Sequence, residues 1–188
     1  MMLLPEQFSL NNVGIRRFAY EDAADYHEAA LESVADAFQF MPWCHENYRL
    51  EEAQGWMASQ VMAWDMRQGY NFIIHAVDTG KLLGAVEVAS IHHGNRFGEL
   101  GYWLRSSATG KGVTTTAAYL AAKFAFDHLA LERLSLTTEP DNIASQRVAE
   151  KIGAIQEATL RNYAYLHGEQ KDVLLYAVLK DELQSPTS

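Results

Sequence analysis

The chain has 188 residues, of which 48% are apolar, 21% charged and 11% aromatic, a composition typical of one folded domain rather than of two domains or a disordered segment. Its formal net charge of −9 argues against non-specific binding to nucleic acid or anionic membranes and favours cationic substrates. The single cysteine, Cys44, excludes an internal disulfide, and no group of Cys and His has the spacing of a zinc site.

The start of the sequence has no signal-peptide pattern. The first ten residues, MMLLPEQFSL, have neither the basic start nor the apolar length of a signal peptide, and no stretch approaches the roughly 20 apolar residues of a membrane helix. We therefore expect a cytoplasmic protein without membrane contact. One domain is expected over residues 1–182, followed by a loose tail over 183–188.

The first half of the chain alternates between helical and strand-like patterns of apolar residues. An aromatic and polar loop, MPWCHENYRL, separates two helices, and the turn Asp78-Thr79-Gly80-Lys81 joins two strands of a hairpin. In chain order the patterns predict a strand at 13–20, helices at 21–37 and 51–68, and strands at 70–77, 82–91 and 99–104.

The second half begins with an amphipathic helix after Gly112, whose apolar face includes Val113, Leu120 and Phe124. The order of all elements, β-α-α-β-β-β-α-β-α-β-β, predicts an α/β (α+β) domain in which helices flank a mixed, mostly antiparallel sheet. The remaining predicted elements are a strand at 133–138, a helix at 141–153, and a hairpin of strands at 156–166 and 171–179.

The segment YWLRSSATGKGVTTTA (102–117) places a lysine between two glycines where a strand gives way to a helix. Residues 100–126 contain no Asp or Glu, although a chain with 24 acids would place about three there, and they do contain Arg105, Lys111 and Lys123. The unpaired N–H groups at the start of a helix favour an anion, and glycine lets a phosphate approach the backbone closely. The pattern predicts a phosphate site in a locally positive field.

Two familiar phosphate-binding loops do not match this segment. A Walker-type loop needs a glycine where Arg105 stands and a Ser or Thr where Gly112 stands. The dinucleotide fingerprint G-x-G-x-x-G has Thr115 in place of its third glycine. These departures argue against an ATPase and a dinucleotide-binding enzyme, and a plain turn between strand and helix stays the structural alternative.

The same segment resembles the acetyl-CoA pyrophosphate loop of GNAT N-acetyltransferases, usually written R/Q-x-x-G-x-G/A, with Ser107 where Arg or Gln is usual. ELGYWL, AFDHLALERLSLTTEPDNIASQRVAEKIGA and DVLLYAVL are similar to the RimJ/RimL branch, which includes enzymes that acetylate the N-terminal amine of ribosomal proteins. The resemblance runs from about 82 to 179, and more weakly through MPW…LEEA upstream. It implies a single GNAT-like domain whose sheet is splayed in the middle, with acetyl-CoA between two strands and no metal.

The resemblance also implies a set of cofactor contacts. The strand end before the loop would contact acetyl-CoA through its backbone, the N–H groups that open the helix would hold the pyrophosphate, and an Asn would contact the pantetheine arm. The residues so implied are Trp103, Leu104, Arg105, Gly110, Lys111, Gly112, Val113, Thr114, Thr115 and Asn142.

Acetyl transfer to an amine needs a proton for the departing thiolate. Many GNAT enzymes use a Tyr where this chain has Ala149, whereas RimL-like enzymes have a Ser that matches Ser145. Asn142, Ser145, Ala149 and Ile152 recur at steps of three and four and therefore share one helix face. Ser145 is the predicted donor, and the alternative is a first-turn hydroxyl that bonds a backbone group.

The amine must also lose a proton, and two carboxylates are candidate bases. Glu87 and Glu99 lie in strands expected to flank the cleft, where an inward-facing acid is costly without a function; the alternative is that they face water. His92 and His93 lie in a neighbouring loop and either titrate usefully or are simply solvated. The catalytic Glu of RimL-like enzymes has no counterpart, because Ala164 stands there.

The acceptor side is predicted to include Trp43, His45 and His92, with Trp56 beside them, unless the two tryptophans belong to the core. An α-amino group has a pKa of about 8 and a lysine a pKa of about 10.4, so a peptide N-terminus is the more readily neutral nucleophile.

The predicted function is direct transfer of the acetyl group of acetyl-CoA, in a ternary complex, to a primary amine, with the N-terminal amine of a protein or peptide preferred. The alternatives are a small amine, such as an antibiotic, a polyamine or a toxin, and a non-catalytic acetyl-CoA-binding module that regulates a partner. No nucleic-acid partner is expected, and a homodimer is left open.

Overall fold

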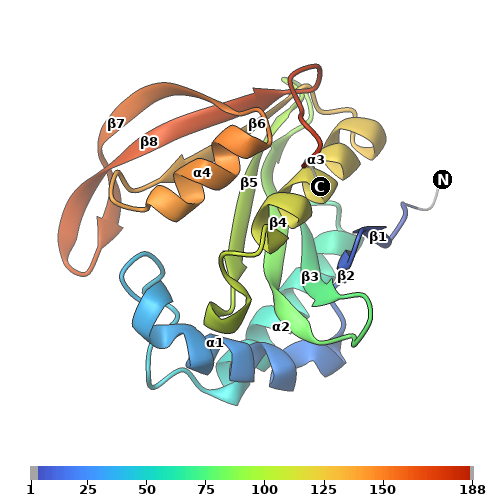
Figure 1. Cartoon of the computed structure of the whole chain (residues 1–188), viewed down its shortest axis with the longest axis vertical. Helices are drawn as coiled ribbons and strands as arrows, with labels where there is room; N and C mark the ends of the chain where they lie inside the picture. The colour runs from blue at the N-terminus through green and yellow to red at the C-terminus, as the bar shows by residue number, and fades with distance from the viewer. Residues whose placement is uncertain (1–3, 187–188) are drawn as a thin grey trace.

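Eight strands form one continuous sheet, and helices cover both of its faces (Figure 1). The computed structural model describes residues 4–186. The strands are β1 (Gln7–Leu10), β2 (Val13–Arg17), β3 (Tyr70–Ala76), β4 (Leu82–His92), β5 (Phe97–Leu104), β6 (Arg133–Thr138), β7 (Ile155–Leu166) and β8 (Glu169–Leu179). The helices are α1 (Ala23–Ala37), α2 (Leu50–Asp65), α3 (Val113–His128) and α4 (Ile143–Lys151), with short 3-10 helices η1 (Tyr20–Asp22) and η2 (Ser106–Ala108).

The strands lie in the order β1-β2-β3-β4-β5-β6-β8-β7. All neighbouring strands are antiparallel except β5 and β6, which are parallel. β5 and β6 pair only over residues 97–99 and 133–135, and beyond this point each strand continues along its other neighbour alone. The prediction of a mixed, mostly antiparallel sheet that is splayed in the middle is therefore confirmed.

Alternation along β3, β4 and β5 places successive side chains on opposite faces of the sheet and builds two cores. Phe72, Val86 and Leu100 belong to a core that includes the buried face of α3. Ile73 and Trp103, one position away along the same strands, belong to a second core with residues of α1 and α2. Adjacent residues of β5 therefore face different helices. At the split, they line opposite ends of the gap between β5 and β6.

The sequence patterns do not predict β1. This strand has only four residues, QFSL, and only every second one is half-buried, so its alternation is too short to recognise. It pairs antiparallel with β2 and extends the edge of the sheet. β2 ends at Arg17, three residues before the predicted end, because the chain turns into η1, where Asp22 accepts a hydrogen bond from Arg16 (2.8 Å).

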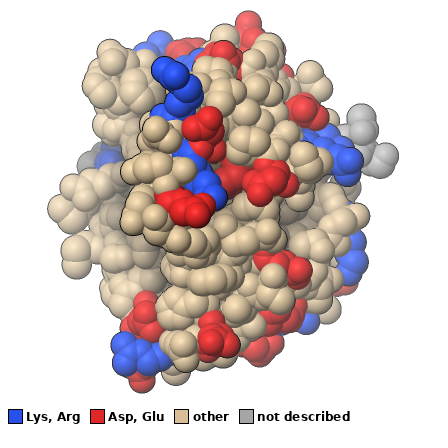
Figure 2. Space-filling view, turned by 90° about the vertical axis from the view of Figure 1, so that its left-hand side faces the viewer, with Lys and Arg blue, Asp and Glu red and all other residues tan. Residues whose placement is uncertain are grey.

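The predicted tail is partly ordered. Leu183 packs against the core and the N–H of Gln184 donates to the carbonyl of Ile152 (3.0 Å), whereas residues 187–188 lie outside the described part of the chain. Within residues 4–186, no helix has the length and apolar character needed to cross a membrane. On the face shown in Figure 2, blue Lys and Arg side chains lie beside red Asp and Glu side chains rather than in one basic patch.

Candidate active site

A cavity of about 600 Å³ passes through the sheet where β5 and β6 separate. β4 and β5 form one wall, and Leu136 and Thr137 of β6 with Ser145 of α4 form the opposite wall. Side chains of α1, α2 and the segment between them close one end. Because successive residues of β5 point to opposite faces, the cavity has two differently lined ends that meet at the split.

One end of the cavity, beside α3 and α4, is lined by two hydroxyl groups. Tyr102 Oη of β5 lies 3.1 Å from Ser145 Oγ and 3.1 Å from the Ser145 carbonyl oxygen. Burial raises the pKa of Tyr102 to about 12. Asn142 caps α4, since its Oδ1 accepts a hydrogen bond from the Ser145 N–H (3.1 Å), so Ser145 is fixed at the start of the helix.

The other end, beside α1 and α2, contains the carboxylate of Glu87. Glu87 lies in register between Asn71 of β3 and Gly101 of β5, and all three line the cavity. A Cβ on Gly101 would lie 2.8 Å from Glu87 Oε1, so this glycine leaves the space that the carboxylate fills. Burial, and secondarily the neighbouring Glu99, raise the pKa of Glu87. Among residues 4–186, Glu87 has no ion pair.

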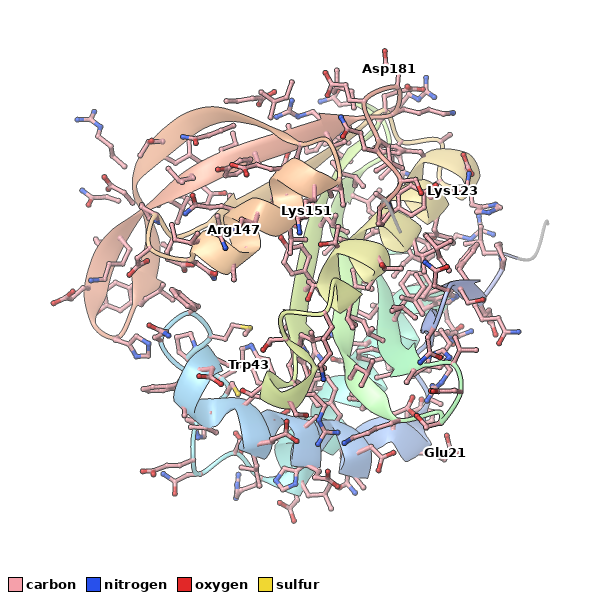
Figure 3. The ribbon with its side chains drawn as sticks, in the orientation of Figure 1. Glu21, Trp43, Lys123, Arg147, Lys151 and Asp181 are labelled. Carbon is pink, nitrogen blue, oxygen red and sulfur yellow. The ribbon has the colours of Figure 1, made fainter. Side chains whose placement is uncertain are left out.

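Aromatic rings line the same end of the cavity as Glu87. Tyr26 stacks on Trp43 with ring centroids 6.0 Å apart, and both rings meet Trp103 edge-on at 5.0 and 5.5 Å. The Trp103 indole N–H donates to the Tyr26 hydroxyl (3.1 Å), which locks this group of rings. In Figure 3, Trp43 lies on the segment that follows α1, below α4. Within the described residues no Lys, Arg or His lines the cavity, so its acceptor end is aromatic and acidic.

The structure separates the sequence-predicted acceptor and base residues into two groups. Trp43 and Trp56 line the cavity, and Trp56 is 41% exposed, so the core alternative is wrong for that tryptophan. Glu99, His45 and His92 are not among the residues that line the cavity.

Each of these three residues has a local contact instead. Glu99 is exposed at the last position where β5 pairs with β6, and its Oε2 accepts a hydrogen bond from Ser90 Oγ (2.9 Å). His92 stacks on Phe97 with ring centroids 5.3 Å apart, and His45 packs edge-on against Tyr48. The expectation that Glu99 faces the acceptor is corrected in favour of Glu87.

The glycine loop opens α3 as predicted. Gly110 and Gly112 have φ of +74° and +76°, a left-handed conformation that glycine adopts without strain, and a Cβ at either would meet no atom within 4 Å. Gly112 is the N-cap residue, so the N–H groups of Val113, Thr114 and Thr115 begin the helix without intrahelical partners. An open backbone with free N–H groups fits a pyrophosphate.

The prediction of a positive field around this loop is wrong, because two of the three cations that were expected to create it are paired with acids. Arg105 is 4% exposed, and its guanidinium bonds to Glu32 and to Glu28 (3.1 Å) of α1. Lys123 pairs with Asp127 (2.6 Å) one turn further along α3. Two of the three cations are thus neutralised by acids, and the backbone N–H groups remain as the main anion-binding feature.

Lys111 and Leu104 complete the predicted cofactor residues. Lys111 is exposed and its ammonium donates to the Ser107 carbonyl (3.0 Å), which closes the loop before the helix. Leu104 is the last residue of β5, and Trp103 before it lines the cavity. Within residues 4–186, no three or more His, Cys, Asp or Glu side chains are grouped as they would be around a metal ion.

Sequence reasoning missed several lining residues, Tyr102 above all. The hydroxyl of Tyr102 in the ELGYWL strand was the available signal, since a tyrosine beside a predicted cleft usually bonds through its OH. Tyr26 and Asn71 offered no comparable signal, because their place in the cavity depends on how α1 and β3 pack.

Comparison with known proteins agrees with this architecture. Residues 12–155 match the family model described as the acetyltransferase (GNAT) domain. Since the match covers more than half of the chain, the protein belongs to the GNAT acetyltransferase family.

Three individual relatives are informative. YdaF of Bacillus subtilis, named as a candidate ribosomal N-acetyltransferase, is 33% identical over 103 residues, 55% of this chain and 56% of YdaF, so the match spans little more than half of that relative. The ribosomal-protein-serine acetyltransferase of Escherichia coli is 25% identical over 171 residues, 85% of this chain and 94% of the relative. RimJ of Mycobacterium smegmatis, solved with CoA-disulfide, has a TM-score of 0.82 at 27% identity, over 92% of this chain and 85% of RimJ.

Proposed function

We propose that the protein is an acetyl-CoA-dependent N-acetyltransferase that transfers the acetyl group directly to a primary amine. The observation that carries this proposal is the cavity through the split sheet. At one end it has a half-buried carboxylate without an ion pair among residues 4–186, and at the other a hydroxyl-bearing helix start. The glycine loop fits the pyrophosphate of the same cofactor. Acetyl-CoA, when bound, supplies the activated acetyl group.

Glu87 attracts the protonated amine and then accepts its proton, directly or through a water. Its raised pKa suits this role, because a carboxylate with a higher pKa is a stronger base. Ser145 donates a proton toward the thiolate from the opposite wall of the cavity. The aromatic rings around Glu87 exclude water and favour a cation over an anion.

The preferred acceptor is the N-terminal amine of a protein or peptide. No Lys, Arg or His among the described residues lines the cavity, so nothing there pairs with a carboxylate next to the amine, as in a free amino acid. A peptide N-terminus has a neutral carbonyl at that position and a lower pKa than a lysine. The printed names of two relatives, which refer to ribosomal N-acetylation and to a ribosomal-protein-serine acetyltransferase, support the same choice.

The test is thiol release from acetyl-CoA against a panel of amines. It pairs phenylalanine with phenylalaninamide and alanine with an alanine-led peptide, and it adds spermidine as a small amine without a carboxylate. We expect each amide or peptide to exceed its free amino acid by about 10-fold or more in kcat/KM, since removing a buried unpaired charge is worth several kcal/mol.

Each outcome on the panel has a distinct meaning. Turnover with no member of the panel would contradict an acetyltransferase and favour the acetyl-CoA-binding module. Spermidine turned over better than every peptide would favour a small amine. A free amino acid equal to its amide would contradict the acceptor chemistry while leaving acetyl transfer intact.

A further inference from the structure

The two hydroxyl groups at the α4 end of the cavity form a pair that spans the split in the sheet. Tyr102 extends from β5, and Ser145 lies in the first turn of α4, on the far side of the split. Their oxygens are 3.1 Å apart, and Tyr102 Oη is also 3.1 Å from the Ser145 carbonyl. Both residues line the cavity. A thiolate that leaves beside Ser145 would therefore also be near the Tyr102 hydroxyl.

Ser145 alone is a poor source of a proton. An aliphatic alcohol is a weaker acid than a phenol, and a serine that loses its proton in a half-buried site leaves an alkoxide with little solvation. The face of α4 that carries Ser145 continues with Ala149, which is buried and has no proton to give. The phenol of Tyr102, 3.1 Å from Ser145 Oγ, can replace the serine proton.

We propose that Tyr102 is a positioning residue that acts through Ser145, replacing the proton that Ser145 gives to the departing thiolate. This inference rests on the proposed function. The amine nitrogen bonds to the acetyl carbon, the carbon–sulfur bond breaks, and sulfur keeps the electron pair and takes the Ser145 proton. The Ser145 oxygen takes the Tyr102 proton, the phenolate recovers one from water, and the amine proton leaves through Glu87.

The protonation state and orientation of Tyr102 suit this role. Burial raises its pKa to about 12, so the phenol carries its proton at neutral pH. In the resting pair, its hydrogen can be donated to the Ser145 carbonyl while its oxygen accepts from Ser145 Oγ–H. When Ser145 turns to the thiolate, the Tyr102 hydrogen turns to Ser145 Oγ without movement of the backbone.

The test compares Tyr102→Phe, Ser145→Ala and the double variant, using the best amine from the panel. Tyr176→Phe is the control, because it removes a phenol from β8 that does not line the cavity. We expect Tyr102→Phe to lower kcat about 10-fold and Ser145→Ala about 30-fold, within the range of general acid catalysis. The double variant should equal Ser145→Ala, because the phenol acts only through the serine.

Three further readouts exclude a merely structural role. The dissociation constant for CoA, measured by calorimetry, and the Tm should change little in Tyr102→Phe. The single-turnover rate against the fraction of D2O should be more strongly curved in the wild type, where the pair moves two protons, than in Tyr102→Phe, where Ser145 moves one.

Several results would overturn the relay. They are wild-type kcat in Tyr102→Phe, effects that multiply in the double variant, a loss confined to CoA affinity, or the same D2O dependence in both proteins. A wild type that acetylates no amine overturns the proposed function itself, so the two failures are distinguishable.

Discussion

The two halves of the sheet, on either side of the split, are built differently. The first half, β1 to β5, is covered by α1 and α2 on one face and α3 on the other, and five consecutive residues of β3 are buried. The second half ends in the β7–β8 hairpin, which reaches out past α4 in Figure 1. No residue of β7 is buried, and Tyr165 near its tip is 68% exposed.

This difference in packing indicates which side chains of the site are held firmly and which are held by few contacts. Glu87, Gly101 and Tyr102 all lie on the first half, in strands packed on both faces, so their mutual geometry is held by two cores. Ser145 lies beyond the split, where the two strands share three paired positions and the Tyr102–Ser145 hydrogen bonds add a second connection. Substitutions of Glu87 and Gly101, which make no bond across the split, should therefore change the chemistry without changing the width of the cleft.

The largest effect is expected for Glu87→Gln, which tests whether the first half supplies the base. The amide keeps the shape but accepts no proton, so kcat/KM for the amine should fall about 100-fold. Glu99→Gln is the control, since Glu99 does not line the cavity, and it should retain at least about half of the activity.

The pH dependence of kcat/KM tests the role of Glu87 independently. Glu87 must be ionised to act, so wild-type kcat/KM should rise with pH through its raised pKa, and Glu87→Gln should lose that rise. A raised pKa also means that ionised Glu87 costs stability as pH increases, so Glu87→Gln should have a higher Tm than the wild type at pH 7. A variant with less activity and less stability would contradict this assignment.

The next effect is on the loop that leaves the first half. Gly110→Asp places a carboxylate at the open N-terminus of α3, and the dissociation constant for acetyl-CoA should rise about 30-fold, as measured by calorimetry. Gly80→Asp is the matched control, because Gly80 has φ +69° and equally open surroundings in the β3–β4 turn. Both variants should lose similar stability, and equal cofactor affinity in the two would contradict a phosphate site at the loop.

A smaller effect is expected for Gly101→Ala, which tests how firmly the first half positions the carboxylate. The new methyl would lie 2.8 Å from Glu87 Oε1, and the end of the Glu87 side chain must move away. We expect kcat to fall about 10-fold, since small misplacements of catalytic groups are costly, with little change in Tm. Gly55→Ala adds the same methyl in open space on α2 and should keep wild-type kcat.

The smallest effect concerns the anchor between the loop and α1. Bonds from Arg105 and Ser107 lower the pKa of Glu32 to about 2 from its usual 4.5. The stability that this group contributes is present above pH 4.5 and is lost as pH falls toward 2. Glu32→Gln should lower Tm at pH 7 by about 4 °C and reduce the loss of Tm between pH 5 and 3. An unchanged acid transition in Glu32→Gln would show that this anchor does not stabilise the fold.

Much of the fold could be predicted from sequence, and the reasons are local. The strands of the central sheet alternate clearly, Asn142 precedes a helix that it caps, and the glycines before Val113 mark a helix start. The prediction of the split depended on resemblance to a family, because the sequence patterns of β5 and β6 do not indicate where their pairing stops.

The choice between the two candidate bases could not be predicted. Glu87 and Glu99 have the same strand alternation and lie on the same face, so the pattern cannot tell them apart. They differ in where they lie on the sheet. Glu87 lies opposite Gly101 inside the cavity, and Glu99 is the last residue of β5 that pairs with β6. The partners of Arg105 were equally hidden, since Glu28 and Glu32 are more than 70 positions away along the chain.

The ion pairs of Arg105 and Lys123 have a consequence for ionic strength. An anion site built from free ammonium and guanidinium groups weakens steeply as salt screens it. Here those two charges are already satisfied, and the helix N–H groups act at contact distance, where counterions screen little. We therefore expect the affinity for acetyl-CoA to change only slightly between dilute buffer and physiological salt, so that occupancy of the site follows the supply of the cofactor rather than the ionic conditions of the cell.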